Sequence, residues 1–597
     1  MIKTMKIKSC VAALLAAFTL GLTTSCADMF DVDSNRVVIN HELDTTADSV
    51  YTTLGVLQCM RKVADRYVLL GEVRGDMVEI NEESTKTSLR NLANFNFDAD
   101  NEYLNVRDYY AIINNCNYAL AKMDDTTLVL GGQFVMMDEY AALLGIRAWT
   151  YLQLAINYGE VYYYTYPIKT EADAQRAKAE GKKDIKAIAA ELTDQLDDFV
   201  DFDMPTFAGL RKVFPVLPLV IADLYLWSGD YENANKFLTD YFMANDDFTL
   251  LESDDNGSVQ QAGYMSLGGA FHVWNGEDKD QKVIGVTSKG EDYSSTDVNA
   301  SGYENLAYIT MEASGDKGVT SELKQLFVSG DNTHSLYPST YWKSLTNQQM
   351  VFLYEKDANN KYKMKSSEKV GDMRKERYWS QMTVVSEISD MLDGEAFDIY
   401  YKHNGSQINI YRRSIACLRW AEAMNALALE RHNAAAADSA QLADARALAV
   451  NSFYLLKDAS KVFFPDSSDV QKKFSRFSES LQTKFIGIHA RGAGDVYADT
   501  TYYVLKPAVI ASRLGKPVEG LEFRDTVEYI DNLIIDELAL ESTLEGNRFG
   551  DLIRFAERRG DVDFLAKRVA GRKGAENFDT ELYEKLTDKA NWYLPFK

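Results

Sequence analysis

Apolar residues recur every three to four positions through long stretches of the chain, and this spacing constrains the fold more than any other feature. A helix built from such a stretch presents one apolar face to its neighbours. Three of these faces are Val106, Tyr110, Ile113 and Leu120; Leu144, Ala148, Tyr151, Ala155 and Tyr158; and Val527, Ile530, Ile534 and Leu538. Proline, which breaks helices, supplies nine of the 597 residues. The sequence therefore predicts a mainly α-helical protein.

Two segments predict pairs of antiparallel helices. Residues 221–234 indicate a helix, a turn at Gly229 and a second helix, in which Gly229 supplies the left-handed cap. Tyr231 and Ala234 would pack the second helix against the first, as in a tetratricopeptide unit. A second pair is predicted over residues 413–429 and 440–458. The repeat is degenerate, so we expect tetratricopeptide-like pairs and not a regular solenoid.

Residues 250–407 have a different composition. The segment is rich in Gly, Asn, Ser and Asp, and its apolar periodicity breaks down. Short β-like runs occur at residues 282–287 and 350–354. Long irregular segments on a rigid scaffold are where binding residues concentrate. We therefore expect a loop-rich second part of the fold, with short strands and the ligand-binding residues.

The first 25 residues predict an export signal. Lys3, Lys6 and Lys8 precede an apolar stretch at residues 11–22, which is shorter than the roughly 20 residues that a membrane-spanning helix needs. Ser25 and Cys26 follow directly, which indicates a lipoprotein signal cut before an acylated Cys26. The alternative is an ordinary secretory signal, because Leu22 lies four residues before the cysteine and a lipobox has leucine three before.

An acidic leader follows the cleavage site. Asp28, Asp31 and Asp33 lie close behind Cys26, and we expect residues 26–45 to form a tether between the lipid and the folded part, residues 46–597. Removal of residues 1–25 takes away three lysines and no acidic residue, which leaves 61 basic against 89 acidic side chains, a net charge of −28. Such a field disfavours binding to nucleic acid.

Motifs for metal, cofactor or catalytic chemistry are sparse. Cys59, Cys116 and Cys417 lie far apart without a C-x-x-C pair, and the six histidines lack metal-ligand spacing. Gly515-Lys516 is followed by Pro517, which removes the hydroxyl that a phosphate-binding loop needs. We therefore expect no cofactor and no metal.

Further motifs follow one another in a fixed order along nearly the whole chain. They are Cys26-Ala-Asp-Met-Phe-Asp31; Leu70-Gly-Glu-Val-Arg-Gly-Asp76; the helix Glu139–Gly159 around Arg147-Ala-Trp-Thr-Tyr151; Gly371-Asp-Met-Arg374; Arg413-Ser-Ile-Ala-Cys-Leu-Arg419-Trp-Ala-Glu422; Glu541-Ser-Thr-Leu-Glu545-Gly-Asn-Arg548-Phe-Gly-Asp551-Leu-Ile-Arg554; and Tyr593-Leu-Pro595. Together they resemble the SusD/RagB family of outer-membrane nutrient-binding lipoproteins. Two positions depart from the family pattern, since Ile146 follows an inserted Gly145 and Phe549 stands near a usual tryptophan.

This resemblance implies an α-helical fold on four tetratricopeptide-like helix pairs with a loop-rich second part. It implies a lipoprotein on the outer face of an outer membrane, where it serves nutrient uptake and polysaccharide utilization. The protein would capture an oligosaccharide or a peptide and act as the lid of a SusC-like TonB-dependent transporter. The resemblance implies no catalysis.

The candidate ligand-binding residues are chosen from composition, because no family motif covers them. Aromatic rings offer flat apolar area against which the C–H faces of sugars can stack. Such rings in the turn-rich region are Trp274, Tyr337, Tyr341 and Trp342, and the amides Asn94 and Asn96 could add hydrogen bonds. Each of these aromatic rings also has a simpler interpretation as core or loop packing. The aromatic residues favour a sugar over a peptide.

Two other functional classes stay open from the sequence. Glu541 and Glu545 lie one helical turn apart with Arg548 beyond them, so a surface glycoside hydrolase is one alternative. A structural ion-pair network is the favoured interpretation of these charges, because charge pairs on helix faces are common. A scaffold lipoprotein that binds only its transporter is the third possibility.

Overall fold

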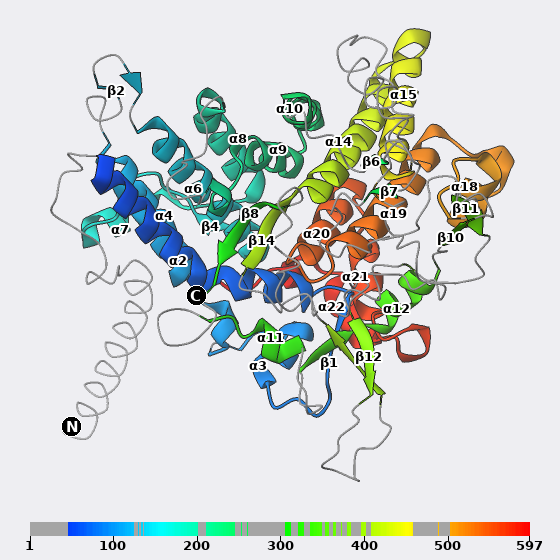
Figure 1. Cartoon of the computed structure of the whole chain (residues 1–597), viewed down its shortest axis with the longest axis horizontal. Coiled ribbons are helices and arrows are strands. Elements are labelled where there is room, and N and C mark those ends of the chain that lie inside the picture. Colours follow the sequence, from blue (N-terminus) through cyan, green and yellow to red (C-terminus); the bar gives the residue numbers. More distant parts are fainter. Residues whose placement is uncertain are drawn as a thin grey trace, which may run out of the picture. The chain divides into compact units, whose positions relative to one another are not determined.

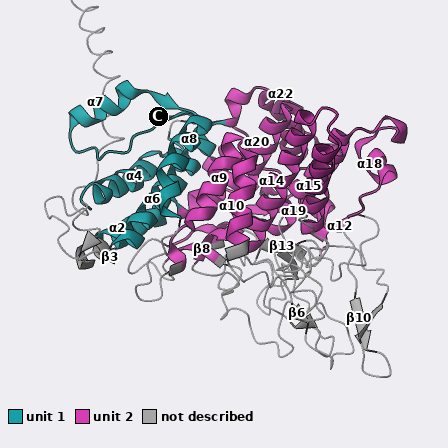
Figure 2. Cartoon of the chain, turned by 90° about the horizontal axis from the view of Figure 1, so that it is seen from above, with its two compact units in different colours: residues 1–63, 97–209, 593–597 teal, residues 64–96, 210–592 magenta. Residues whose placement is uncertain are grey.

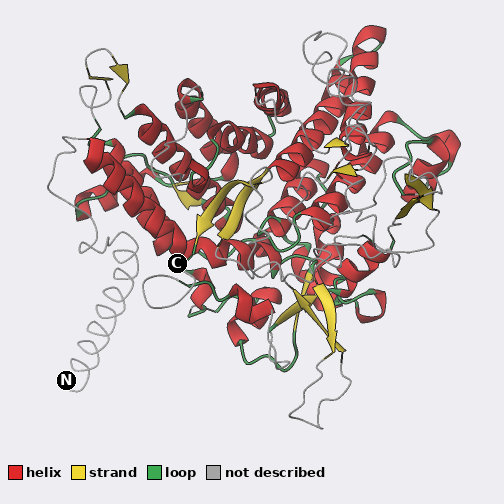
Figure 3. Cartoon of the chain, in the orientation of Figure 1, coloured by secondary structure: helices red, strands yellow, loops and turns green. Residues whose placement is uncertain are grey.

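Helices predominate among the residues that the computed structural model describes (Figure 3). The described residues are 46–98, 100–123, 129–130, 133–134, 136–200, 211–244, 252–253, 259–260, 305–311, 320–327, 335–348, 353–356, 362–365, 372, 379–383, 396–400, 407–457, 488 and 502–596. Cys26, Trp274 and the predicted strand at residues 282–287 lie outside them. No described helix combines the length and the apolar composition that a membrane crossing requires.

The chain divides into two compact units, drawn in different colours in Figure 2. Unit 1 comprises residues 1–63, 97–209 and 593–597, and unit 2 comprises residues 64–96 and 210–592. The long helix α2 (Thr46–Glu72) contributes its first part to unit 1 and its last turns to unit 2.

Unit 1 is built around the helix α6 (Met137–Tyr158), which packs against α4 (Arg107–Leu120) and α8 (Ile185–Leu196). Its remaining elements are η3 (Glu102–Leu104), β2 (Val129–Leu130), β3 (Gln133–Phe134), β4 (Val161–Tyr162), α7 (Glu171–Glu180), β5 (Lys182–Lys183) and η4 (Asp197–Phe199). The predicted apolar faces of α4 and α6 are buried. Arg147 of α6 donates to Asn117 Oδ1 of α4 at 2.9 Å and to Gln195 Oε1 of α8 at 2.8 Å, which links the three helices.

Unit 2 contains the first predicted helix pair, α9 (Leu217–Ser228) and α10 (Tyr231–Ala244). Gly229 adopts the left-handed conformation, with φ +84°, and its N–H donates to Tyr225 O at 3.1 Å. Ala234 is fully buried, as the tetratricopeptide-like spacing predicts. The prediction of this helix pair is therefore confirmed.

The second predicted pair is also present, as α14 (Arg413–Ala434) and α15 (Ser439–Lys457). Both helices pack against α19 (Phe523–Glu541) (Figure 1). The predicted apolar face of α19 is buried. The other helices of this unit are η6 (Arg211–Val213), α3 (Thr87–Ala93), α11 (Leu323–Phe327), α12 (Thr340–Asn347), α18 (Pro507–Leu514), η10 (Val518–Gly520), α20 (Arg548–Arg559), α21 (Val562–Ala570), η11 (Ala575–Asn577), α22 (Thr580–Leu586) and η12 (Lys589–Trp592).

The described strands of unit 2 form two-stranded antiparallel sheets. They are β1 (Val78–Ile80) with β9 (Leu336–Pro338), β8 (Asn305–Thr310) with β14 (Gln407–Arg412), β10 (Leu353–Lys356) with β11 (Tyr362–Lys365), β12 (Trp379–Thr383) with β13 (Ala396–Tyr400), and β6 (Glu252–Ser253) with β7 (Val259–Gln260). The fold class is therefore the predicted one, mainly helical with short strands.

Two glycines allow the end of α2 to touch the loop before α20. A Cβ atom built on Gly71 would lie 1.9 Å from Gly546 O, and one built on Gly546 would lie 2.7 Å from Tyr67 O. Gly546 also has φ +84°, and its N–H donates to Glu72 Oε1 at 2.8 Å. The two backbones are therefore in contact at a point where any side chain would separate them.

We predict that Gly71→Ala lowers the free energy of unfolding by about 3 kcal/mol, because the methyl group forces two backbones apart. Gly55→Ala in the same helix is the matched control, since a Cβ there meets nothing within 4 Å. That change should be neutral or stabilise the protein by up to about 1 kcal/mol through helix propensity. Urea unfolding measures both, and equal effects of the two variants would contradict the close approach.

Candidate ligand-binding surface

The segment 335–348 carries three of the predicted binding residues and is fixed at its start by β1 and by the residues just before β1. Ser339 is the N-cap of α12: its Oγ accepts from Trp342 N at 3.0 Å and donates to Asp76 O at 2.6 Å. Glu79 of β1 accepts from Thr340 N at 2.6 Å and from the Tyr337 hydroxyl at 3.2 Å. Tyr337 is half-buried, with Lys343 Nζ 5.9 Å from its ring centre.

Tyr341 lies in a cluster of aromatic and charged side chains. Its hydroxyl donates to Asp536 Oδ1 of α19 at 3.3 Å and accepts from Arg568 of α21. Arg568 also donates to Asp536 Oδ1, at 3.1 Å, and Tyr502 donates to Asp536 Oδ2 at 3.2 Å. Burial raises the pKa of Tyr341, so its hydroxyl keeps its proton at neutral pH. We call Tyr341, Tyr502, Asp536 and Arg568 the tyrosine cluster.

Asn94 and Asn96 lie in a tight turn after α3, and their side-chain oxygens accept hydrogen bonds that hold this turn in place. Arg572 donates to Ala93 O at 2.9 Å and to Asn94 Oδ1 at 3.5 Å. Lys585 donates to Asn96 Oδ1 at 2.7 Å. Phe95, between the two amides, has φ +55°. Basic side chains at a helix C-terminus also complement its dipole, so these contacts stabilise the turn.

The structure separates the candidate residues by exposure. Trp342 is fully buried, and its Nε1 donates to Thr543 Oγ1 at 3.0 Å. In this conformation its ring packs in the core, and we do not carry it into a binding surface. Tyr337, Tyr341 and Asn94 are half-buried and Asn96 is exposed. Trp274 and Cys26 lie outside the described residues.

Glu541 and Glu545 are held in a buried ion-pair cluster. Arg412 donates to Glu541 Oε1 at 2.9 Å and to Glu545 Oε2 at 2.8 Å. None of the three side chains is more than 5% exposed. Carboxylates that flank a scissile bond need access to water and sugar, which these two lack. The interpretation as a structural ion-pair network is confirmed for this pair.

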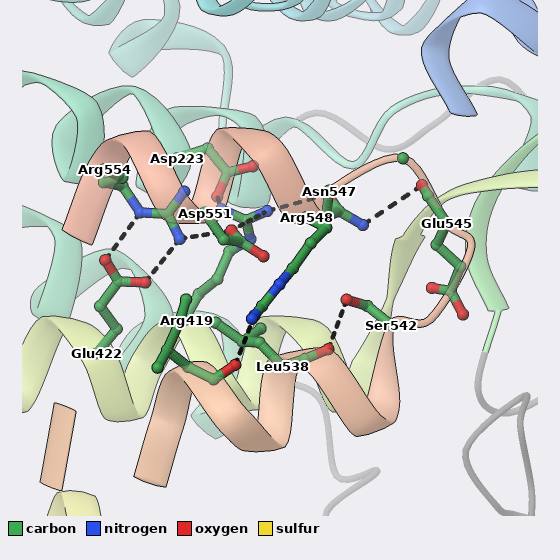
Figure 4. A network of polar contacts seen from close by, with 12 residues as sticks. Asp223, Arg419, Glu422, Leu538, Ser542, Glu545, Asn547, Arg548, Asp551 and Arg554 are labelled. Atoms are coloured by element: carbon green, nitrogen blue, oxygen red, sulfur yellow. Dashed lines mark hydrogen bonds and ion pairs between the residues drawn. The ribbon is translucent and has the colours of Figure 1, made fainter. Parts of the chain in front are cut away.

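The same network continues along α20 (Figure 4). Arg554 donates to both carboxylate oxygens of Glu422 of α14, at 2.8 and 2.7 Å, and to Asp551 Oδ1 at 2.8 Å. Arg419 lies 3.2 Å from Asp223 Oδ1. Burial alone would raise the pKa of Glu422, but the charges and hydrogen bonds of Arg554 and Arg558 lower it to about 2.

The partners of Tyr341 in the tyrosine cluster were not predicted from the sequence. Tyr502, Asp536 and Arg568 lie outside the quoted motifs, and their chain positions alone do not bring them together. Two signals were available, the Tyr502-Tyr503 doublet and the dense run of arginines from Arg554 to Arg572. Among the residues that the structure describes, no cluster of His, Cys, Asp and Glu is arranged to hold a metal ion.

Comparisons with known proteins identify the fold. No family model and no curated protein sequence matches this chain. A SusD superfamily protein from Bacteroides vulgatus superposes with a TM-score of 0.51 at 12% identity, covering 93% of this chain and 96% of that one. A second from the same species has a TM-score of 0.50 at 13% identity, covering 86% and 89%.

A third similar structure carries a more specific name. The surface glycan-binding protein A from Bacteroides fluxus superposes with a TM-score of 0.50 at 13% identity, covering 90% of this chain and 94% of that one. At such identities the likeness establishes the fold. The chain has the fold of the SusD superfamily.

Acid titration tests the arginine network. The folded-state pKa of Glu422 lies below its ordinary value of 4.5, so its stabilising effect is full above pH 4.5 and is lost toward pH 2. We predict that Glu422→Gln lowers the free energy of unfolding by about 3 kcal/mol at pH 7. Urea unfolding from pH 7 to pH 3 should show this difference narrowing below pH 4.5, and a constant difference would contradict the assignment.

Proposed function

We propose that this chain is a cell-surface lipoprotein that captures oligosaccharides and delivers them to a SusC-like TonB-dependent outer-membrane transporter, over which it acts as a lid. The observation that carries the proposal is the fold, shared over about nine-tenths of both chains with a protein named surface glycan-binding protein A. The order of the sequence motifs supports it independently.

The proposal assigns a role to each part of the chain. Residues 1–25 are the signal peptide, Cys26 carries the lipid, and residues 26–45 are the tether. More than one acyl chain anchors a protein stably, because each buried methylene contributes about 0.8 kcal/mol. A lid needs both a firm anchor and freedom to move. Residues 250–407 form the ligand-binding region.

Within that region we propose Tyr337 and Tyr341 as stacking rings for the sugar. Both are half-buried, so each is held in place and retains accessible surface. The neighbouring Asp536 and Arg568 fix the Tyr341 hydroxyl and offer charged hydrogen-bonding groups to sugar hydroxyls. Trp274, at the start of the same region, completes the proposed aromatic set.

The role is binding without hydrolysis. A glycoside hydrolase would present two accessible carboxyl groups about 5–9.5 Å apart across a cleft. The carboxylate pair that the sequence offered for this role, Glu541 and Glu545, is buried against Arg412. The buried ion pairs of these two carboxylates with Arg412 favour a binding protein over a glycoside hydrolase.

We predict that Tyr341→Ala weakens binding to the captured oligosaccharide about tenfold, which corresponds to about 1.4 kcal/mol of lost ring contact. Tyr341→Phe retains the ring and should change affinity less than threefold. Tyr166→Ala, a half-buried tyrosine of unit 1, is the control for loss of a ring elsewhere. Calorimetric titration against a glycan panel measures all three. Equal affinity of Tyr341→Ala and the intact protein would remove Tyr341 from the site.

The lipid anchor has its own test. Cells that express the intact chain and are fed radioactive palmitate should yield a labelled protein in the membrane fraction. Cys26→Ala should carry no label and leave that fraction, because no acyl chain remains. Label retained by Cys26→Ala would contradict the assignment and favour the ordinary secretory signal.

A further inference from the structure

Arg559, the last residue of α20, differs from the other arginines of its helix in its partner. Arg548, Arg554 and Arg558 each reach a carboxylate oxygen at 2.8 Å or less. Arg559 donates to a neutral amide oxygen, Asn532 Oδ1, at 3.0 Å. Its carboxylate contact within the described part of the chain is longer, 3.8 Å from Nε to Asp531 Oδ2.

Asp531 is already occupied by other donors. Its Oδ1 accepts from Arg558 at 2.8 Å and from Asn425 at 2.7 Å. Arg559 therefore shares a carboxylate that another guanidinium neutralises first. A largely buried cation that lacks a close anion has most of its desolvation cost left uncompensated.

A second arginine lies beside Arg559, across the ring of Phe564. The guanidinium carbons of Arg559 and Arg568 lie 4.4 and 4.9 Å from the centre of this ring. Both Arg568 terminal nitrogens share one oxygen of Asp536 at 3.1 Å. Burial and repulsion from Arg558 and Arg568 lower the pKa of Arg559, although Asp531 and Glu528 oppose this. Arg568 is better compensated, by Asp536 and, at 3.9 Å, by Asp76. Arg559 is therefore the arginine of α20 whose charge is least compensated.

These two guanidinium groups are partly accessible and adjoin the proposed sugar site. The Arg559 and Arg568 side chains are 15% and 17% exposed. Arg568 contacts the hydroxyl of Tyr341, one of the two proposed stacking rings. An anion that reached both guanidinium groups would lie next to a sugar on Tyr341.

We propose that Arg559 and Arg568 bind an acidic substituent, a carboxylate or a sulfate, on the captured oligosaccharide. The inference rests on the proposed function and names its substrate class, acidic glycans. Guanidinium groups bind such anions through paired charge-assisted hydrogen bonds. The net negative charge of the chain does not prevent this at close range, because salt screens exposed charges beyond about 8 Å and the nearest carboxylates already pair with arginines.

The test begins with a calorimetric panel of defined oligosaccharides. The acidic members are oligogalacturonate, hyaluronate and chondroitin sulfate, and the neutral members are galactan, glucan and mannan. The expected result is binding of at least one acidic member. Binding of neutral members alone overturns this inference and leaves the proposed function standing. Binding of no member, at millimolar protein and ligand, counts against the proposed function itself.

The acidic ligand that binds is then compared with its methyl-esterified or desulfated form, on the intact protein and on Arg559→Gln. We expect about a tenfold loss of affinity from either change alone and little further loss from both together. Equal affinity for the charged and uncharged ligand, or an Arg559→Gln variant that binds the charged ligand as well as the intact protein, overturns the inference.

Two controls separate this effect from general charge and from misfolding. Lys567→Gln removes one exposed positive charge from the same helix as Arg568 and should change affinity less than twofold. Arg559→Gln should not lower the melting temperature, because the lost charge is poorly compensated. If it does, the comparison of charged and uncharged ligand on the intact protein decides alone.

Discussion

The fold of unit 2 depends on buried arginines that pair with carboxylates from distant parts of the sequence. Arg548 donates to both oxygens of Asp76, Arg554 to both oxygens of Glu422, and Arg412 to Glu541 and Glu545. A bidentate pair fixes the relative orientation of the two side chains as well as the distance between them. Removal of one partner from such a pair leaves an uncompensated buried charge, which costs about 3–5 kcal/mol. These pairs therefore fix how α20 packs against α14 and against the segment between α2 and β1.

The candidate surface inherits its geometry from this network. Asp76, held by Arg548, accepts through its backbone oxygen from Ser339, which caps α12. Thr543, between Glu541 and Glu545, accepts from the buried Trp342. Tyr341 lies in the chain between Ser339 and Trp342, which these hydrogen bonds anchor. Its ring is therefore positioned by side chains that would not touch the ligand. A binding surface of this kind would need little reorganisation on capture.

Much of the fold could be predicted from the sequence, and less of the site. Helices 217–244 and 413–457 follow from apolar spacing and from the glycine at position 229, which are local properties. Burial of Trp342 could not be predicted, because an aromatic residue in a turn-rich segment packs inward or outward according to its tertiary partners. The same holds for Asn94 and Asn96, whose partners Arg572 and Lys585 lie almost 500 residues away. The weak compensation of Arg559 follows from the closer approach of Arg558 to Asp531, which only the three-dimensional packing determines.

The proposed role is to bind glycans and leave them intact. In the most direct measurement, the purified protein is incubated with the glycan panel and the bound oligosaccharides are recovered. Mass spectrometry then gives the mass, and so the length, of each bound oligosaccharide. The account predicts an oligosaccharide retained at its original length, with no shorter product in solution after prolonged incubation. Shortened products would contradict it and point to hydrolysis.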